Sequence, residues 1–360
     1  MKKAALVSGA SIAGLTMAYW LNRYGYKVTV VEISAGLKKG GSPIDIRAEA
    51  IDVAERMGIY EKIKAMSLET TIEFVNAENE CIGTLNGLGK DESGRDIELH
   101  RNHLIEIIQE SAGPDIEYLF SNSIQTINQD ENTVTVTLKD GQTRNFDFLF
   151  GADGVHSSVR RLVFGNEENY NHFCGAYFAI LNVDKNNERQ NAGRMYNMPS
   201  KMAGISTKGN LILLFKSPKL IYDYSNASQH KQILNEKFSE CGWQIPAILK
   251  TMTNSNELYF DEICQIKMSS WTKGRVALIG DAAHCSGFPT GMGSSLAMHG
   301  ATLLADELKA SNGDYQSAFS KYDTSLHPVV EAIQATVMHG LSFLVPDTEE
   351  AISSRNSMVS

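Results

Sequence analysis

The chain opens with an apolar strand, a glycine turn and an apolar helix. Residues Ala4 to Val7 form a short hydrophobic run, and Leu15 to Tyr24 carries a helical pattern that stops before Gly25. A second hydrophobic run, Lys27 to Glu32, ends on an acidic residue. The pattern predicts a strand–helix–strand unit of the length found in dinucleotide-binding folds.

Further along, helical and strand-like patterns alternate. Helices are predicted at Ala48–Met57, Arg101–Ser111, Ser294–Leu308 and Tyr315–Leu344, a hairpin at Thr133–Leu138 and Thr143–Phe150, and a buried strand at Arg275–Ile279. The last dozen residues are polar, and we expect them to fray.

Between about residues 172 and 268 the pattern changes to strands around a single helix. The strand-like segments are Tyr177–Val183, Leu211–Lys216 and Leu258–Ile266, and the helix is Ser228–Cys241. This arrangement predicts an antiparallel sheet inserted into the nucleotide-binding part of the chain.

Composition narrows the class of protein. A length of 360 residues predicts two domains, or one large domain with an insertion. The net charge of −9 disfavours nucleic acid as a partner. The five cysteines form no C-x-x-C pair, so we expect no metal site and no disulfides, only reduced thiols in a cytoplasmic protein.

The amino terminus resembles a signal peptide, because two lysines precede a run of apolar and small residues that ends at Ala18. Gly9 and Gly14 interrupt that run at the spacing of a nucleotide fold, which favours the folded interpretation. Elsewhere no apolar stretch reaches the ~18 residues that a membrane span requires, so we expect no membrane partner.

The first motif, Gly9-Ala10-Ser11-Ile12-Ala13-Gly14, suits a phosphate group. The first turn of a helix offers N–H groups and a positive dipole end, and glycine allows a tight turn and close approach. Ser11 replaces the usual middle glycine. Glu32 is placed to accept hydrogen bonds from ribose hydroxyls, which favours the adenosine of FAD or NAD over that of NADP. The alternative is an ordinary turn in an α/β core.

Two more motifs follow predicted buried strands. Gly151-Ala152-Asp153-Gly154 leads towards Arg160, and Gly280-Asp281-Ala282-Ala283-His284 is followed by Gly291-Met292-Gly293 before a helix. A carboxylate just beyond a strand end, followed by small residues at a helix start, suits a polyhydroxyl chain beside a phosphate.

With these three motifs in this order, the chain resembles the single-component FAD-dependent aromatic hydroxylases, the class of p-hydroxybenzoate hydroxylase. Within that class it is most similar to the tetracycline-inactivating flavin monooxygenases. The stretches that carry this closer resemblance are Lys39-Gly40-Gly41, Asp45-Ile46-Arg47, Ile266-Lys267-Met268 and Trp271-Thr272-Lys273-Gly274-Arg275.

The resemblance implies an α/β fold: a Rossmann-like FAD-binding domain with an inserted antiparallel-sheet substrate domain and a C-terminal helix. We expect residues 1–70, 98–171 and 269–325 to form the FAD-binding domain. Residues 71–97 and 172–268 would form the substrate-binding domain, and 326–360 the C-terminal helix and tail.

The resemblance also implies residue roles. Glu32 would hold the adenosine ribose, Arg101 the pyrophosphate and ribityl region, and Asp281 the ribityl chain. Asp153 and Arg160 would contact FAD and the nicotinamide cofactor, and the turn Gly291–Ser295, with Gly293 and Ser294, would face the flavin's pyrimidine edge.

Two residues are candidates for catalysis. Arg47 would lie over the flavin or meet the nicotinamide cofactor, and His284 would shuttle a proton. Both have structural alternatives, since a histidine at a helix start often serves packing. The run Gly291-Met292-Gly293-Ser294-Ser295 and the later Met298-His299-Gly300 depart from the family pattern near the flavin.

The implied function is that of a monooxygenase. NADPH or NADH would reduce non-covalently bound FAD, and O2 would then form a C4a-hydroperoxyflavin that hydroxylates an electron-rich aromatic or polyketide substrate, tetracycline among them. We expect a monomer. Candidate substrate-lining residues are Phe178, Met195, Met202, Phe215 and Met268, with core packing as the alternative.

Two other functions stay open. The enzyme could hydroxylate a biosynthetic phenol or polyketide unrelated to antibiotic resistance. The chain could also be a binding protein that holds flavin or an aromatic ligand without turnover.

Overall fold

The computed structural model describes residues 2–37, 43–86, 94–181, 192–207, 209–255 and 257–359, arranged in two compact units. The first unit comprises Met1–Ser67, Arg95–His172 and Cys264–Ala335, and the second comprises Leu68–Gly94, Phe173–Ile263 and Thr336–Ser360. Each unit is assembled from three separate stretches of the chain. Long-range packing, and not chain continuity, therefore defines both.

The first unit is built on a six-stranded sheet in the order β17-β18-β11-β1-β2-β7. Its strands are β1 Ala4–Ser8, β2 Lys27–Val31, β7 Glu117–Leu119, β11 Phe148–Gly151, β17 Thr272–Lys273 and β18 Val276–Leu278. All neighbouring strands are parallel except β17 and β18. From β1 the chain builds outward through β2 and β7 on one side, then through β11 and β18 on the other. The strand order thus reverses beside β1, the position at which such sheets bind ligands.

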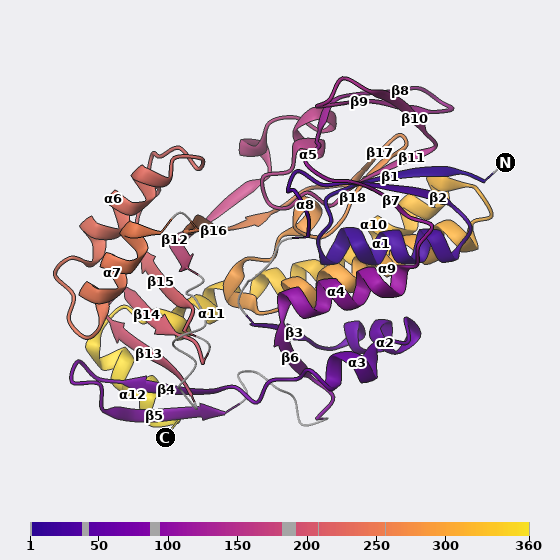
Figure 1. Cartoon of the computed structure of the whole chain (residues 1–360). Coiled ribbons are helices and arrows are strands. Elements are labelled where there is room, and N and C mark those ends of the chain that lie inside the picture. Colours follow the sequence, from indigo (N-terminus) through magenta and orange to yellow (C-terminus); the bar gives the residue numbers. More distant parts are fainter. Residues whose placement is uncertain are drawn as a thin grey trace. The chain divides into compact units, whose positions relative to one another are not determined.

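Helices cover one face of this sheet and a small sheet covers the other (Figure 1). The helices are α1 Ile12–Arg23, α4 Arg101–Ala112, α9 Gly293–Ala310 and α10 Tyr315–Ala335; the three-stranded sheet is β8 Ile124–Gln129, β9 Val134–Leu138 and β10 Thr143–Phe146. Every residue of α1 from Ile12 to Leu21 is buried, because the sheet, α4 and α9 surround this helix. Trp20 Nε1 donates a hydrogen bond to Thr302 Oγ1 at 2.8 Å and so joins α1 to α9.

Short elements complete the first unit. They are β3 Pro43–Ile46, which pairs antiparallel with β6 Ile97–His100, and the helices α2 Glu49–Arg56, α3 Tyr60–Lys64, α5 Ser158–Val163 and α8 Asp281–His284.

The second unit is built on a seven-stranded sheet in the order β16-β12-β15-β14-β13-β4-β5. Its strands are β4 Thr71–Val75, β5 Cys81–Asn86, β12 Asn171–Leu181, β13 Gly193–Met198, β14 Lys201–Ile205, β15 Leu211–Lys216 and β16 Tyr259–Ile266; its helices are α6 Ala227–Phe238, α7 Ile245–Asn254, α11 Val337–Leu344 and α12 Glu349–Met358. The pair β4–β13 is parallel, whereas β12–β15, β14–β15, β13–β14 and β4–β5 are antiparallel.

Side chains on the strands point alternately to the two faces of this sheet, and both faces are apolar. Tyr177, Leu213 and Phe215 pack with residues of α6 and α7, while Leu214 on the other face packs with Val337 of α11. Successive strand residues point to opposite faces, so neighbours such as Leu214 and Phe215 enter different cores.

The two faces separate the candidate substrate-lining residues. Met195 and Met202 lie on the α11 face, with Phe178 beside them, whereas Phe215 is fully buried on the opposite face against Phe238 of α6. Met268 packs against the core of the first unit. Within the second unit, Phe215 therefore does not share a surface with the other three residues, and for Phe215 the alternative of core packing holds.

The mixed α/β fold predicted from the sequence is confirmed, with local corrections. The second hairpin strand is two elements, because β10 ends at Phe146 and β11 enters the parallel sheet. The helix predicted at Tyr315–Leu344 is divided into α10 and α11. The polar C-terminus, expected to fray, forms α12, and α7 was not predicted at all. Lys39-Gly40-Gly41 and the end of the strand predicted at Tyr177–Val183 lie outside the described residues.

No single helix among the described residues is long and apolar enough to cross a membrane. The bent pair formed by Tyr315–Leu344 and Glu349–Met358, at 101° to each other, meets that requirement only when taken together, by length and composition.

Arg355 explains why the polar C-terminal segment is ordered. Its side chain is almost completely buried, and its guanidinium lies 4.2 Å from the ring centroid of Phe74. Nη1 donates to Phe343 O at 2.8 Å, and Nη2 donates to Asn197 Oδ1 at 2.8 Å. Thr348 caps α12 by accepting a hydrogen bond from the N–H of Ala351. One long side chain thus joins α12 to α11 and β13.

We expect Arg355→Met to lower the free energy of unfolding of the second unit by about 2–3 kcal/mol, because buried oxygens on two elements lose their donor. Urea unfolding followed by tryptophan fluorescence (Trp243 lies in this unit) measures the change. Lys219→Met is the control within the same unit, since the pair of the exposed Lys219 with Glu262 contributes about 0–1 kcal/mol. Equal losses in both variants would contradict the role given to Arg355.

Candidate functional site

The three sequence motifs and Glu32 meet at one edge of the six-stranded sheet. Each follows the carboxyl end of a parallel strand: Gly9 follows β1, Glu32 follows β2, and Ala152 follows β11. Gly280 lies two residues after the carboxyl end of β18 and begins the fourth segment. Backbone hydrogen bonds join these ends in series, from Gly9 N–H to Val31 O at 2.8 Å and from Ala152 N–H to Ser8 O at 2.8 Å. The motifs therefore form one continuous rim.

The glycine turn is shaped by close backbone contacts. Gly9 has φ +104°, and a Cβ there would overlap the carbonyl oxygen of Ala152. A Cβ on Gly14 would overlap the carbonyl oxygen of Gly9. Ser11 precedes the first turn of α1, and its hydroxyl lies 3.5 Å from Ala152 O. The turn thus presents the N-terminus of α1, with Ile12 and Ala13 in its first turn, as a seat for an anion.

Glu32 is held in place by the main chain. Its Oε2 accepts a hydrogen bond from Ala10 N–H at 2.8 Å, and its Oε1 accepts one from Ser34 N–H at 2.9 Å. A carboxylate offers about four acceptor positions, so both oxygens keep capacity for hydroxyl donors. The neighbouring Ile33 is 72% exposed, and this open apolar side chain suits contact with an aromatic ring.

The third motif packs directly on the first. Gly280 has φ +59°, and a Cβ there would come within 2.7 Å of Ala13 Cβ. Both the backbone conformation and the space therefore require glycine at this position. The turn after β18 is thereby fixed against the first turn of α1.

Asp153 and Arg160 hold the second motif together. Asp153 Oδ1 accepts a hydrogen bond from the Ser157 hydroxyl at 2.5 Å, and Oδ2 accepts one from Val159 N–H at 3.1 Å. Burial raises the pKa of Asp153, while these hydrogen bonds act in the opposite direction. Arg160 is fully buried and donates to Ala282 O at 2.9 Å and to Glu167 at 3.2 Å. The second motif is thus tied to the third.

Asp281 and Arg101 act on each other across the site. Desolvation by the surrounding protein raises the pKa of Asp281, although this residue is exposed at the surface of the chain, which weakens the effect. The positive charge of Arg101, the first residue of α4, lowers that pKa. The two side chains therefore place opposite charges beside the start of α8.

Arg47 belongs to a network that ends at α9. Its Nη2 lies 2.8 Å from Asp45 Oδ2, and its Nε lies 3.7 Å from Asp96 Oδ2. Arg47 N–H donates to Ser295 Oγ at 3.0 Å, and the Ser295 hydroxyl donates to Asp45 O at 3.1 Å. A Cβ on Gly291 would lie 3.7 Å from Asp45 Oδ2 and 3.9 Å from Arg47 Nη1. Arg47 is thus held beside the Gly291–Ser295 turn.

That turn presents the start of a long helix. Gly291 adopts the left-handed conformation at φ +66°, and α9 begins at Gly293. A Cβ on Gly293 would meet no atom within 4 Å, so the space before this helix is open. The first N–H groups of a helix have no intrahelical acceptor and carry partial positive charge. Gly293 and Ser294 therefore stand where an anionic or electron-rich edge can bind.

His284 is packed into the core. Its ring is 1% exposed, lies at 5.0 Å from the Trp271 ring and approaches the Tyr322 hydroxyl at 3.4 Å. Burial lowers the pKa of His284 to about 3, so the ring is neutral at physiological pH. This environment suits a packing residue.

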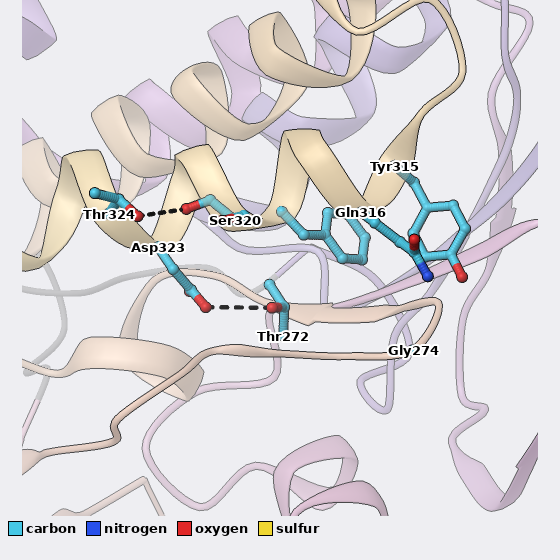
Figure 2. Close-up of a pocket in the computed structure, with 8 residues that line it drawn as sticks. Thr272, Gly274, Tyr315, Gln316, Ser320, Asp323 and Thr324 are labelled. Carbon is cyan, nitrogen blue, oxygen red and sulfur yellow. Dashed lines mark hydrogen bonds between the residues drawn. The ribbon is translucent and has the colours of Figure 1, made fainter.

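A shallow cavity of about 340 Å³ lies elsewhere on the first unit (Figure 2). It is lined by Thr272, Gly274, Tyr315, Gln316, Phe319, Ser320, Asp323 and Thr324. Gly274 precedes β18, so the cavity borders the amino end of that strand, opposite the rim that carries the motifs. In the described part of the chain, no group of three or more His, Cys, Asp or Glu side chains could hold a metal ion.

From the sequence, Asp45 and Asp96 received no role, and Ser295 was placed only within the turn Gly291–Ser295. A signal for Asp45 was present, since residues i and i+2 on a strand share a face and Asp45 stands two positions before Arg47. Asp96 and Ser295 come from distant elements, so only the packed structure brings them to Arg47.

Comparison with known proteins agrees with this geometry. Residues 2–336 match the model of a family described as "FAD binding domain". A flavin-dependent monooxygenase from an unknown prokaryotic organism is 38% identical, over 99% of this chain and 95% of that protein. An uncharacterised protein of Mycobacterium tuberculosis is 39% identical, over 97% and 96%. The crystal structure of tetracycline destructase Tet(51) superposes with a TM-score of 0.88, at 35% identity over 100% of this chain and 96% of that one.

We expect Gly280→Ala to lower the free energy of unfolding of the first unit by about 3 kcal/mol. A backbone at φ +59° and ψ −145° costs alanine about 1–3 kcal/mol, and the added methyl group must also displace Ala13. Gly25→Ala isolates the first cost, because Gly25 has φ +87° and open space around it. Chemical denaturation of both variants tests this, and equal losses would show that packing at Gly280 contributes nothing.

We expect His284 to make the protein less stable in mild acid. Its folded pKa of about 3 lies below the ordinary value of 6.5, so the unfolded state takes up a proton first as pH falls through 6.5. Between pH 7 and pH 5 this removes about 2 kcal/mol of stability. His284→Asn should remove that acid sensitivity, and the exposed control His339→Asn should keep it, in urea titrations at both pH values. An unchanged pH dependence in His284→Asn would contradict the assignment.

Proposed function

The chain belongs to the FAD-binding family that includes the flavin-dependent monooxygenases, and for this FAD-dependent oxidoreductase we propose an electron donor, a reaction and a class of substrate. It takes electrons from NADPH or NADH and uses O2 to hydroxylate electron-rich aromatic or polyketide molecules. Tetracyclines are the first candidate substrates. The observation that carries the proposal is the convergence of the four strand-end segments on one rim beside the reversal of strand order.

The residues on this rim fit FAD. The N-terminus of α1 suits the pyrophosphate, because its N–H groups are open and Gly9 and Gly14 keep the backbone compact. Glu32 is oriented to accept hydroxyl donors of the adenosine ribose. Asp281 and Arg101 supply an acceptor and a cation for the ribityl and phosphate region. These groups match the chemistry of an elongated, doubly charged dinucleotide.

Bound FAD supplies the two-electron chemistry that passes electrons from a nicotinamide to O2. The side chains of the protein bind and orient FAD, substrate and reductant. The first turn of α9, at Gly293 and Ser294, would stabilise negative charge at the pyrimidine edge of the isoalloxazine. Arg47 orients an anionic group of substrate or reductant, and Asp45 and Asp96 hold its guanidinium. Asp153 and Arg160 act by holding the second motif against the third.

His284 has a different role in this proposal from the one predicted. Because its ring is buried and neutral, we assign it to packing beneath the rim, against Trp271 and Tyr322. Catalysis then requires no proton shuttle from this position.

The second unit is assigned to substrate recognition. Its sheet presents Phe178, which is half-buried and contacts Tyr259 at 5.6 Å between ring centroids. Met195 and Met202 are buried with α11, so they support this face from within. The tetracycline assignment rests on similarity along the whole chain to the tetracycline destructases Tet(51) and Tet(55), at 35% and 34% identity.

The test is NADPH and NADH consumption in air by the FAD-loaded protein, with and without tetracycline, while the drug is followed by absorbance and mass. Faster consumption with a product heavier by one oxygen supports the whole proposal. Reductant oxidation that responds to a panel of phenols and polyketides, and not to tetracycline, overturns the substrate assignment and keeps the chemistry. Bound FAD that no ligand renders reactive would instead indicate a binding protein.

We expect Glu32→Gln to weaken FAD binding about 10- to 100-fold, because a charged acceptor for the ribose hydroxyls becomes neutral and only one of its two main-chain hydrogen bonds can remain. Quenching of FAD fluorescence on titration with apoprotein measures the dissociation constant. Glu110→Gln, an exposed site on α4, is the control. If Glu32→Gln binds FAD as the parent does, the adenosine does not lie against Glu32.

A further inference from the structure

The segment from Cys285 to Met292 joins α8 to α9. It follows α8, which begins at Asp281, and leads to the first turn of α9. Gly287 at φ +90° and Gly291 at φ +66° give this segment two sharp bends, and a short 3-10 turn, Phe288–Thr290, lies between them. The direction in which the start of α9 points therefore depends on how this connecting segment is held.

Two buried glutamines hold its beginning. Gln265 Nε2 donates to Ser286 O at 3.1 Å and to Gln334 O at 2.7 Å. Gln334 Nε2 donates to Cys285 O at 3.0 Å and to Ile266 O at 3.0 Å. The two amides thus bond two consecutive carbonyls of the connecting segment, one bond from each side chain. We call Gln265 and Gln334 the amide clamp.

The clamp uses its full donor capacity. A primary amide has two N–H donors, and both glutamines direct both donors to carbonyl oxygens. The side chains are only 4% and 6% exposed. Ile266 N–H also donates to Cys285 O at 3.1 Å, so β16 runs alongside the segment that the clamp holds. An apolar residue would fill either position without the risk of an unpaired polar group, so the amides point to a positional role.

The clamp also stands where the chain passes between the two units. Gln265 lies two residues after Ile263, the end of a stretch of the second unit, and Gln334 lies two residues before Thr336, where the next begins. The hydrogen bond from Gln265 Nε2 to Gln334 O therefore joins both crossing segments within the first unit. The two side chains fix these segments to the consecutive carbonyls of Cys285 and Ser286.

We propose that Gln265 and Gln334 are positioning residues for flavin chemistry. By fixing Cys285 O and Ser286 O, the clamp sets the path of the connecting segment and with it the direction of the α9 N–H groups at the flavin's pyrimidine edge. The inference rests on the proposed placement of FAD. It goes beyond that placement because the clamp bonds Cys285 and Ser286, which lie between the sequence motifs and not within them.

The experiment uses Gln265→Met and Gln334→Met in the full chain, since methionine keeps the length of the side chain and removes its donors. Gln316→Met, an exposed position on α10, is the matched control. For each protein we would measure the FAD dissociation constant, the midpoint potential of bound FAD and the melting temperature of the apoprotein. No substrate is needed for these readouts.

In both clamp variants we expect FAD binding about tenfold weaker, which corresponds to about 1.4 kcal/mol, and a midpoint potential shifted to a more negative value. The potential falls because displaced N–H groups stabilise negative charge on the flavin less well. Gln316→Met should keep the parent's dissociation constant and potential.

A parental potential in both clamp variants, together with a lower melting temperature, would overturn the proposal and leave the glutamines with a role in stability alone. If Gln334→Met does not fold, Gln265→Met decides, because it keeps the bond from Gln334 to Cys285 O. Failure of the proposed hydroxylation would appear as absent reductant oxidation in the parent, and the comparison of dissociation constants and potentials would still stand.

Discussion

The close approach of backbone to backbone at the carboxyl edge of the first sheet is the constraint on which the rest depends. Gly9 lies against the carbonyl of Ala152, Gly14 against that of Gly9, and Gly280 against Ala13. No side chain larger than hydrogen fits between these segments. The three motifs can therefore share one rim only with glycine at these positions, and α1 then begins at the point where the strand order reverses.

Buried polar groups fix what the glycines bring together. Arg160 connects the second motif to Ala282 in the third, and the clamp of Gln265 and Gln334 holds the segment that follows. In the second unit Arg355 does the same for the C-terminal helix. In each case an extended side chain with several donors bonds carbonyl oxygens of separate elements. Such residues set the arrangement of segments that apolar packing alone would leave free to shift.

The sequence predicts the local chemistry well, because each motif is a run of neighbouring residues beside a strand. The strand–helix–strand start and the family follow from the run Gly9–Gly14 and from Glu32. What could not be predicted depends on pairing across the chain. Asp96 reaches Arg47 only because β6 pairs with β3, and Phe215 leaves the face of Met202 because a strand alternates its side chains. The order of α12 depends on Arg355. Its partners Asn197 and Phe343 belong to other elements, and its own segment is polar, so the sequence gives no sign of its burial.

Hydrogen exchange of the apoprotein and of the FAD complex, measured peptide by peptide, locates the FAD site. If FAD lies along the rim, it protects three separate stretches: Gly9–Gly14, Glu32–Ser34 and the segment from Asp281 to Leu296. Protection confined to the residues around the shallow cavity, such as Thr272–Gly274 and Tyr315–Thr324, would contradict it. FAD would then bind at the opposite edge of the sheet, and the rim would not be its site.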